Sequence, residues 1–435
     1  MSSSKSFNAQ DGGSTSSAYT KRPHSSVILW LALAISSLAC IRLAYLSHNI
    51  RITCFDDTVI HAGWTDSSIN NNNLLMDYSI GRFYAPFKFA ILGSLQGSAS
   101  PLVHTLARIV SLLIAASGAA WFCSSYTGHR NDSLVATTLF LSTYPYFEGY
   151  QAFFSNPLLL LGLGAICTSA VLFNYSNSIA RACGLVLFAL ALFCHEVFIP
   201  FLLLHLILLL SNKREGGAAQ LRQLAPAFTI LIAYCALYFS LRIYAHGTYD
   251  GVQPSLNPHA FAKALCRYSL AGLPGAEIWF DRNTIATIPI RSESAVLAII
   301  SNHTNLYTVV LSLAAGWLVY YHLSFTKNEQ IRTRFLPVIF LLSLVILPNV
   351  LPSITVKYQI WAMQRRIPYY YGTLGLTFLY SGLFHLFRFM NLNHKFQVIT
   401  ISIIVLYIVL TTQAMNPEVV SRLIAHPIDT LATSP

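Results

Sequence analysis

Long apolar runs separated by short polar connections follow one another along most of the chain. Runs of about 17–25 residues are long enough for an α-helix to cross ~30 Å of hydrocarbon. Most of the runs lack the polar stripe expected of a helix at the surface of a soluble protein. The pattern therefore predicts an all-α, polytopic transmembrane bundle with about eleven spans. The expected spans are 27–46, 102–123, 133–147, 157–173, 181–195, 197–211, 224–243, 303–323, 335–351, 369–387 and 396–413.

Composition supports the same class. Of the 435 residues, 54% are hydrophobic and only 10% are charged, against roughly 25% charged residues in an average soluble protein. The formal net charge of +11 would suggest nucleic acid as the partner of a soluble protein. Here the basic residues lie largely in the connections between apolar runs, so we expect no nucleic-acid partner and assign the charge to membrane topology.

The distribution of Lys and Arg predicts the orientation. With the N-terminus inside, every internal connection carries or touches a positive charge, whereas the short external turns carry none. The internal connections are 124–132, 174–180, 211–223, 324–334 and 388–395. We therefore expect a multi-pass membrane protein whose working face is periplasmic, extracellular or lumenal. Of these we favour the periplasmic or extracellular face of a bacterial inner (plasma) membrane.

Three external segments are much longer than the other connections. They are 48–101, 244–302 and 351–368. Long loops in compact proteins tend to be functional, and apolar residues among polar ones predict short helices lying at the membrane interface. The remaining division is a disordered cytoplasmic tail at 1–26, a membrane domain at 27–413 and an external C-terminal tail at 414–435.

Acidic residues are scarce, which makes their positions informative: the chain has sixteen Asp and Glu residues in all. Among those in the external segments and turns, we take Asp56, Asp57, Glu148 and Glu196 as candidate catalytic carboxylates. A carboxylate at the membrane edge is costly unless it faces a cavity or a partner. Taken one at a time, each has an ordinary alternative as a solvated turn residue or as the partner of a nearby Arg or His.

Basic and aromatic side chains on the same face are candidates for substrate binding. They are Arg82, His195, Lys357, Arg365, Arg366 and Tyr369. Guanidinium groups hold phosphate through two parallel hydrogen bonds, and basic residues at the head-group level meet lipid phosphates. The alternative for the arginine pair is a simple anchor to anionic lipid, and for His195 a packing role. No Cys or His spacing predicts a metal site, so no metal ligand is assigned.

Several short motifs together resemble the GT-C superfamily of membrane glycosyltransferases, in its protein-mannosyltransferase-like and bacterial lipid-A sugar-transferase-like branch. The similarity covers about residues 27–390. The motifs are Asp56-Asp57 after the first span, Ser-Pro-Leu-Val-His104 at the second, Cys-His195-Glu196 followed by Pro200, and Arg365-Arg366-Ile-Pro368 before a late span. Gly-Arg82-Phe is similar to a motif of O-antigen glucosyl transferases. The chain departs from the family in carrying His195 where relatives carry Lys, and in lacking Asp-x-Asp in the second external turn.

The resemblance implies an inverting transfer of a sugar from a polyprenyl-phosphate carrier to a glycan, lipid or protein acceptor. Asp56 or Asp57 would act as general base on the acceptor hydroxyl. The arginine pair at 365–366 would stabilise the leaving phosphate, while Glu196 and His195 would orient the arginines or the sugar. A divalent cation near the acidic pair is compatible with this scheme but not required.

Three other functions remain open at this point. One is a polymerase or ligase of surface polysaccharide that uses a polyprenyl-diphosphate donor. Another is a transporter, for which charged or helix-breaking residues near mid-span and paired repeats are the expected signs. The last is a non-catalytic scaffold.

Overall fold

The computed structural model describes residues 23–47, 82–84, 86–87, 90–91, 100–144, 155–211, 217–245, 253–274, 293–326, 335–363, 370–389 and 394–425. Within these ranges the chain is helical and has no β-strand, only one isolated bridge between Pro254 and Thr355. The six expected site residues Asp56, Asp57, Glu148, Arg365, Arg366 and Tyr369 lie outside the described residues.

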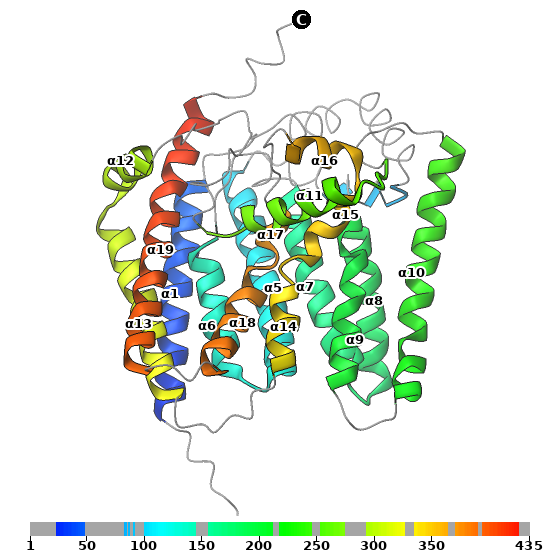
Figure 1. Ribbon diagram of the computed structural model, residues 1–435, viewed down its shortest axis with the longest axis horizontal. Helices are drawn as coiled ribbons and strands as arrows, with labels where there is room; N and C mark the ends of the chain where they lie inside the picture. Colours follow the sequence, from blue (N-terminus) through cyan, green and yellow to red (C-terminus); the bar gives the residue numbers. More distant parts are fainter. Residues whose placement is uncertain are drawn as a thin grey trace, which may run out of the picture.

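Most helices run side by side along one direction, and a few lie across one end (Figure 1). We call the end that carries α11 (Pro258–Ala271), α15 (Val350–Ile354) and α16 (Val356–Met363) the capped end. The remaining helices are α1 (Pro23–Ser47), α5 (Pro101–Thr127), α6 (Arg130–Ser142), α7 (Ser155–Phe173), α8 (Ser178–Cys194), η1 (Glu196–Phe201), α9 (Leu202–Ser211), α10 (Gly217–Ala245), α12 (Glu293–His303), α13 (Leu306–Thr326), α14 (Phe335–Ser343), η4 (Leu347–Asn349), α17 (Tyr370–Thr373), α18 (Leu376–Phe389) and α19 (His394–Ala425).

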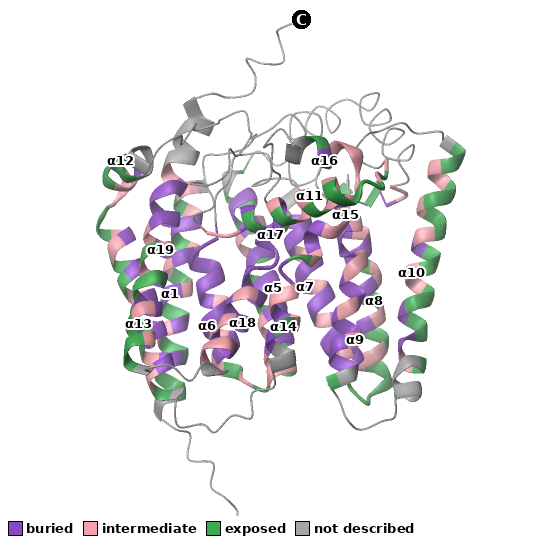
Figure 2. Ribbon diagram, in the orientation of Figure 1, coloured by how far each residue is buried: buried purple, intermediate pink, exposed green. Residues whose placement is uncertain are grey.

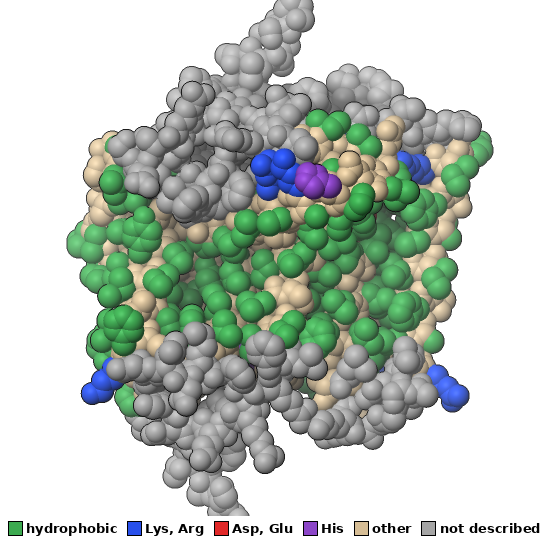
Figure 3. All heavy atoms as spheres, viewed as in Figure 1, with side chains coloured by type: hydrophobic (Ala, Val, Ile, Leu, Met, Phe, Trp, Pro, Cys, Tyr) green, Lys and Arg blue, Asp and Glu red, His purple; other side chains and the backbone are tan. Residues whose placement is uncertain are grey.

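Five helices are long and apolar enough to cross a bilayer. They contain Ser25–Leu46, Leu102–Thr127, Arg222–Tyr244, Leu306–Phe325 and Lys395–Pro417. Hydrophobic side chains cover the middle of the visible face, and Lys and Arg side chains lie toward its upper and lower rims (Figure 3). A belt of this kind matches the hydrocarbon layer of a membrane. Each expected span overlaps a helix, but the number of eleven stays a prediction.

Small residues let two of these helices pack closely. A Cβ atom at Gly118 of α5 would lie 2.6 Å from the backbone oxygen of Gly164 on α7. Close backbone approach at small residues is a common basis of helix association in membranes. Buried residues line the faces that the helices turn toward one another, whereas α10 is largely exposed (Figure 2). Only 17% of the residues in its most apolar stretch are buried, so α10 offers most of its surface to lipid.

Several helices are too short to cross hydrocarbon. The 13 residues of α6 rise about 20 Å, less than the ~30 Å of a hydrocarbon core. The carbonyl groups at its end are satisfied by α19, where Gln413 Nε2 donates to the oxygen of Ser142 at 2.8 Å and Asn416 Nδ2 to that of Tyr144 at 3.4 Å. A helix can end inside an apolar bundle only when its last carbonyls have such donors.

Two expectations about the external segments can be compared with the fold. The segments 244–302 and 351–368 do contain short helices, of which α11 and α16 lie across the capped end (Figure 1). The helix α19 continues to Ala425, beyond the expected span 396–413, and the external tail at 414–435 stays a prediction. The polar residues after 413 include Asn416, which packs against the end of α6.

Replacing Gly118 by alanine should destabilise the bundle. The new methyl group would overlap the backbone of Gly164, and such overpacking costs about 1–3 kcal/mol. We expect a lower melting temperature of the detergent-purified protein for Gly118→Ala. Ser117→Ala, at an exposed position next to it, is the control and should leave the melting temperature unchanged. Equal melting temperatures for both variants would show that the α5–α7 contact is looser than described.

Candidate functional site

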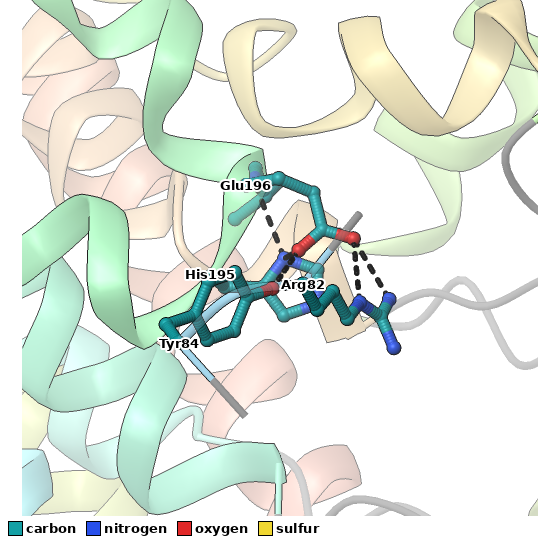
Figure 4. A network of polar contacts seen from close by, with 5 residues as sticks. Arg82, Tyr84, His195 and Glu196 are labelled. Atoms are coloured by element: carbon teal, nitrogen blue, oxygen red, sulfur yellow. Dashed lines mark hydrogen bonds and ion pairs between the residues drawn. The ribbon is translucent and has the colours of Figure 1, made fainter. Parts of the chain in front are cut away.

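A partly buried ion pair joins residues 82–84 to the turn between α8 and η1 (Figure 4). Arg82 donates from both Nε and Nη2 to Oε1 of Glu196, at 3.2 and 2.7 Å. The two side chains retain only 20% and 16% of their exposure. The pair spans 114 positions of sequence, so it holds Arg82 against an element that is far away along the chain.

The second carboxylate oxygen of Glu196 has its own donor. The hydroxyl of Tyr84 donates a hydrogen bond to Oε2, and Tyr84 itself is buried. With Arg82 on one oxygen and Tyr84 on the other, the carboxylate is well satisfied. This arrangement stabilises the ionised form of Glu196.

His195 shapes the turn that presents Glu196. Its backbone is extended, and its ring Nδ1 accepts a hydrogen bond from the backbone N–H of Val197 at 3.1 Å, which caps η1. An accepting Nδ1 carries no proton, so the ring is neutral with its proton on Nε2. The 3.6 Å between Nδ1 and Oε2 of Glu196 is therefore not a hydrogen bond.

Aromatic contacts hold the segment 82–84 in place. Phe83 packs edge-on against Phe193 near the end of α8, with ring centroids 5.7 Å apart, and lies 5.2 Å from Tyr234 on α10. Tyr84 stacks on the same Tyr234 at 6.4 Å. These rings bridge α8 and the otherwise exposed α10, so the capped end of α10 is tied to the cluster.

The charge state of Glu196 follows from its surroundings. Burial by itself would raise the pKa of this carboxyl, but the positive charge of Arg82 and the hydrogen bonds from Arg82 and Tyr84 outweigh it. The pKa of Glu196 therefore lies well below its usual value. Burial, with the nearby Glu196 charge, raises the pKa of Tyr84 well above its usual value. At neutral pH the cluster holds an anionic Glu196 and a neutral Tyr84.

Of the ten residues proposed from the sequence, the structure describes four. Glu196, Arg82 and His195 come together in this cluster, as the single working face predicts. Lys357 lies half-buried on α16 at the capped end. Sequence reasoning missed Tyr84 and Tyr234. The only available signal for Tyr84 was its place two residues after Arg82, and Tyr234 lies within an apolar run and gave none.

A second buried cluster lies at the end of the bundle opposite the cap. Asp132 on α6 accepts from Nε2 of His322 on α13 at 2.7 Å, and Nε2 of His385 on α18 lies 3.5 Å from its other oxygen. Both Asp132 and His322 are fully buried. The Nδ1 of His322 has no hydrogen-bond partner among the described residues. The cluster ties three helices together.

The hydrogen bond between Ser169 and His205 in the bundle runs in the opposite direction to that between a catalytic serine and its base. The hydroxyl of Ser169 donates to the carbonyl oxygen of Gly184 at 2.6 Å. The Nε2 atom of His205 lies 2.8 Å from the hydroxyl oxygen of Ser169. A hydroxyl has one proton, so His205 must donate to Ser169. In catalysis the histidine would accept that proton. Among the described residues, no group of three or more His, Cys, Asp or Glu side chains is arranged to hold a metal ion.

The pH dependence of stability should reveal Glu196. Because its folded pKa is lowered, its contribution to stability is present above the unfolded value of about 4.3 and is lost as pH falls through the folded value. Glu196→Gln should therefore lower the free energy of unfolding by about 1–3 kcal/mol near neutral pH. The difference in stability from wild type should become smaller below about pH 4. Melting temperatures between pH 7 and pH 3 measure it. In the double variant, Arg82→Gln should add little to the loss of stability caused by Glu196→Gln. A difference in melting temperature between wild type and Glu196→Gln that stays constant with pH would contradict the assignment.

Asp132 should matter for stability in a different way. Asp132→Ala removes the acceptor of His322 and should cost about 1.5–3 kcal/mol, the range for hydrogen bonds to charged groups. The matched control is Thr137→Ala on the same helix, since Thr137 bonds only to the backbone oxygen of Ser133. Chemical unfolding of the purified protein compares the two. A loss no greater than that of the control would mean that the cluster is not a structural tie.

Comparison with known proteins adds no identity to this description. No family model matches the chain, no curated protein matches it, and no solved structure matches it.

Proposed function

We propose that the protein transfers a sugar from a polyprenyl-phosphate donor to an acceptor at the outer face of the membrane. The observation that carries the proposal is the buried cluster of Arg82, Tyr84 and Glu196 near the capped end of a membrane bundle. The distribution of basic residues predicts that this end faces outward. The motif resemblance to the GT-C superfamily agrees with the same reaction.

Arg82 is the phosphate-binding residue in this proposal. A guanidinium group positioned by a carboxylate keeps a fixed orientation, which favours binding of a phosphate ester over solvent. One fifth of the Arg82 side chain remains exposed, so its positive charge is accessible to a ligand. Its charge would stabilise the polyprenyl phosphate as it leaves the anomeric carbon. Arg365 and Arg366 would join it from a different external segment.

Glu196 acts as a positioning residue rather than as the base. A general base works best with a pKa near the working pH, and the lowered pKa of Glu196 makes it a weak base. Its oxygens also already accept from Arg82 and Tyr84. The motif resemblance favours Asp56 or Asp57 over Glu148 as the base, which removes the proton of the acceptor hydroxyl as that oxygen attacks the anomeric carbon. The bond from this carbon to the phosphate oxygen breaks with inversion.

Two other functions share parts of this arrangement. A polymerase or ligase of surface polysaccharide would use the same positive charge for a polyprenyl-diphosphate donor. A transporter is favoured by a separate observation, the helix α6 that ends inside the bundle with Asp132 buried near its start. Interrupted helices and intramembrane acids are typical of transport pathways. The sugar-transfer proposal is preferred because it uses the cluster at the capped end.

The proposal is tested by measuring sugar transfer in proteoliposomes that contain a polyprenyl-phosphate sugar and an acceptor. We expect Asp56→Asn or Asp57→Asn to lower the rate by about 10²–10⁴-fold, the usual contribution of a general base. Arg82→Gln should lower transfer and raise the KM for the donor, while Glu196→Gln, acting through Arg82, should give a smaller loss. The control is Arg242→Gln, in the last turn of α10, which should transfer normally.

The competing functions give different outcomes in the same vesicles. Full activity of both Asp56→Asn and Asp57→Asn would remove the assigned base. A clear preference for a diphosphate donor would favour the polymerase or ligase. Movement of a solute across the membrane without any covalent product would favour the transporter.

A further inference from the structure

Arg42 is a buried cation on the packed side of α1. It keeps only 8% of its exposure and continues the row of buried residues formed by Ile35, Ala39 and Leu43. Arg42 lies five residues before the end of α1, and so about 7 Å below it. Its level is therefore close to the head groups of the leaflet at the capped end. An arginine this deeply buried needs a compensating partner.

The described residues supply no acidic partner for Arg42. Only two acidic side chains are described, and Asp132 and Glu196 each have partners of their own elsewhere in the bundle. The Nε of Arg42 has no hydrogen-bond acceptor. Its guanidinium carbon lies 5.3 Å from the ring centroid of Tyr307 and 6.0 Å from that of Tyr45. Two aromatic faces compensate part of the charge but offer no acceptor to Nε.

A second positive element lies beside Arg42. Tyr307 is in the first turn of α13, and its hydroxyl donates to the backbone oxygen of Leu38 on α1, which fixes the start of α13 against α1. The N-terminus of a 21-residue helix carries a partial positive charge and attracts anions. Asn305 caps this start, since its Oδ1 accepts from the backbone N–H of Thr308 at 3.0 Å, while the helix keeps its partial positive charge. The guanidinium of Arg42 thus lies beside the Tyr307 ring of the first turn, where an anion would be stabilised by both positive charges.

The nearest negative end of a helix is already occupied. The hydroxyl oxygens of Ser36 on α1 and Thr138 on α6 lie 3.4 Å apart. Arg42 comes six residues after Ser36, and Tyr144 comes six residues after Thr138. Arg42 therefore lies at about the level of Tyr144, just past the end of α6. The carbonyl groups of that end accept from Gln413 and Asn416. They offer only a partial negative charge to Arg42.

We infer that Arg42 and the first turn of α13 form a binding site for the phosphate group of a membrane phospholipid. The chemistry is that of guanidinium and helix N-termini, both of which favour phosphate. The lipid is reached through Tyr45, which is 69% exposed and lies at the perimeter of the bundle. Exposed tyrosines at this level are typical of the membrane interface. The chain therefore carries a lipid site that is independent of the proposed sugar transfer.

This site is separate from the Arg82–Glu196 cluster. The helices α1 and α13 lie at one side of the bundle, and α8 and α10 lie at the opposite side (Figure 1). A phospholipid held at Arg42 would link α1 to α13 without entering the cluster. Its loss should therefore change lipid binding and leave the contacts of Glu196 intact.

Native mass spectrometry of the detergent-purified full chain tests the inference with two lipids of equal chain length. Phosphatidic acid carries the phosphate and diacylglycerol does not, so wild type should retain phosphatidic acid and not diacylglycerol. Arg42→Gln should bind phosphatidic acid about tenfold or more weakly, as expected for loss of charge-assisted hydrogen bonds. Arg242→Gln, in the last turn of α10, is the matched control and should bind like wild type.

A second variant, Tyr45→Leu, tests the same site if the Arg42→Gln protein does not fold. Tyr45→Leu changes an exposed side chain. It should weaken the binding of phosphatidic acid by about two- to fivefold, because the Tyr45 ring no longer orients the Arg42 guanidinium toward the lipid. Equal binding of phosphatidic acid by wild type, Arg42→Gln and Tyr45→Leu would overturn the inference. So would equal retention of diacylglycerol and phosphatidic acid by wild type. Retention of polyprenyl phosphate in place of phosphatidic acid would overturn the assignment to a phospholipid.

Discussion

An ionised side chain inside an apolar helical bundle persists only where the fold surrounds it with partners. Glu196 illustrates the constraint, since its two oxygens accept from Arg82 and Tyr84 while nearly all of its surface is covered. Satisfying this carboxylate brings Arg82 and Tyr84 to the α8–η1 turn. The aromatic contacts of Phe83 and Tyr234 then tie α10, which packs loosely elsewhere, to the same place.

The same constraint applies to the backbone. A helix as short as α6 leaves its last carbonyls within the bundle, where no water is at hand. The amides of Gln413 and Asn416 take the place of water, so the position of α19 is coupled to the end of α6. At the other end of α6, Asp132 depends on His322. A short helix with polar groups at both ends is thus held by side chains from other helices, and it interrupts an otherwise apolar interior.

Sequence reasoning performed differently for the spans and for the site. The expected spans each overlap a helix because hydropathy is a property of neighbouring residues. The acid of Cys-His-Glu was singled out because a carboxylate between two apolar runs is rare and costly. Its assignment as a catalytic group is less favoured by the geometry than a positioning role, because a lowered pKa makes it a weak base. That shift depends on Arg82, whose contact with Glu196 no sequence pattern predicts.

The sequence by itself determined that this is an all-helical membrane chain, where its apolar helices lie and which segments between them are long. From the distribution of basic residues it also predicted that Glu196 and Arg82 lie on one face of the membrane. Only the tertiary structure decided which side chains meet, because such pairs are 112 to 190 positions apart. It likewise left Arg42 buried against the start of α13, in a row of residues that reads as apolar along the chain. Local hydrophobicity sets where a helix forms, whereas the packing register of distant helices sets the partner of each buried charge.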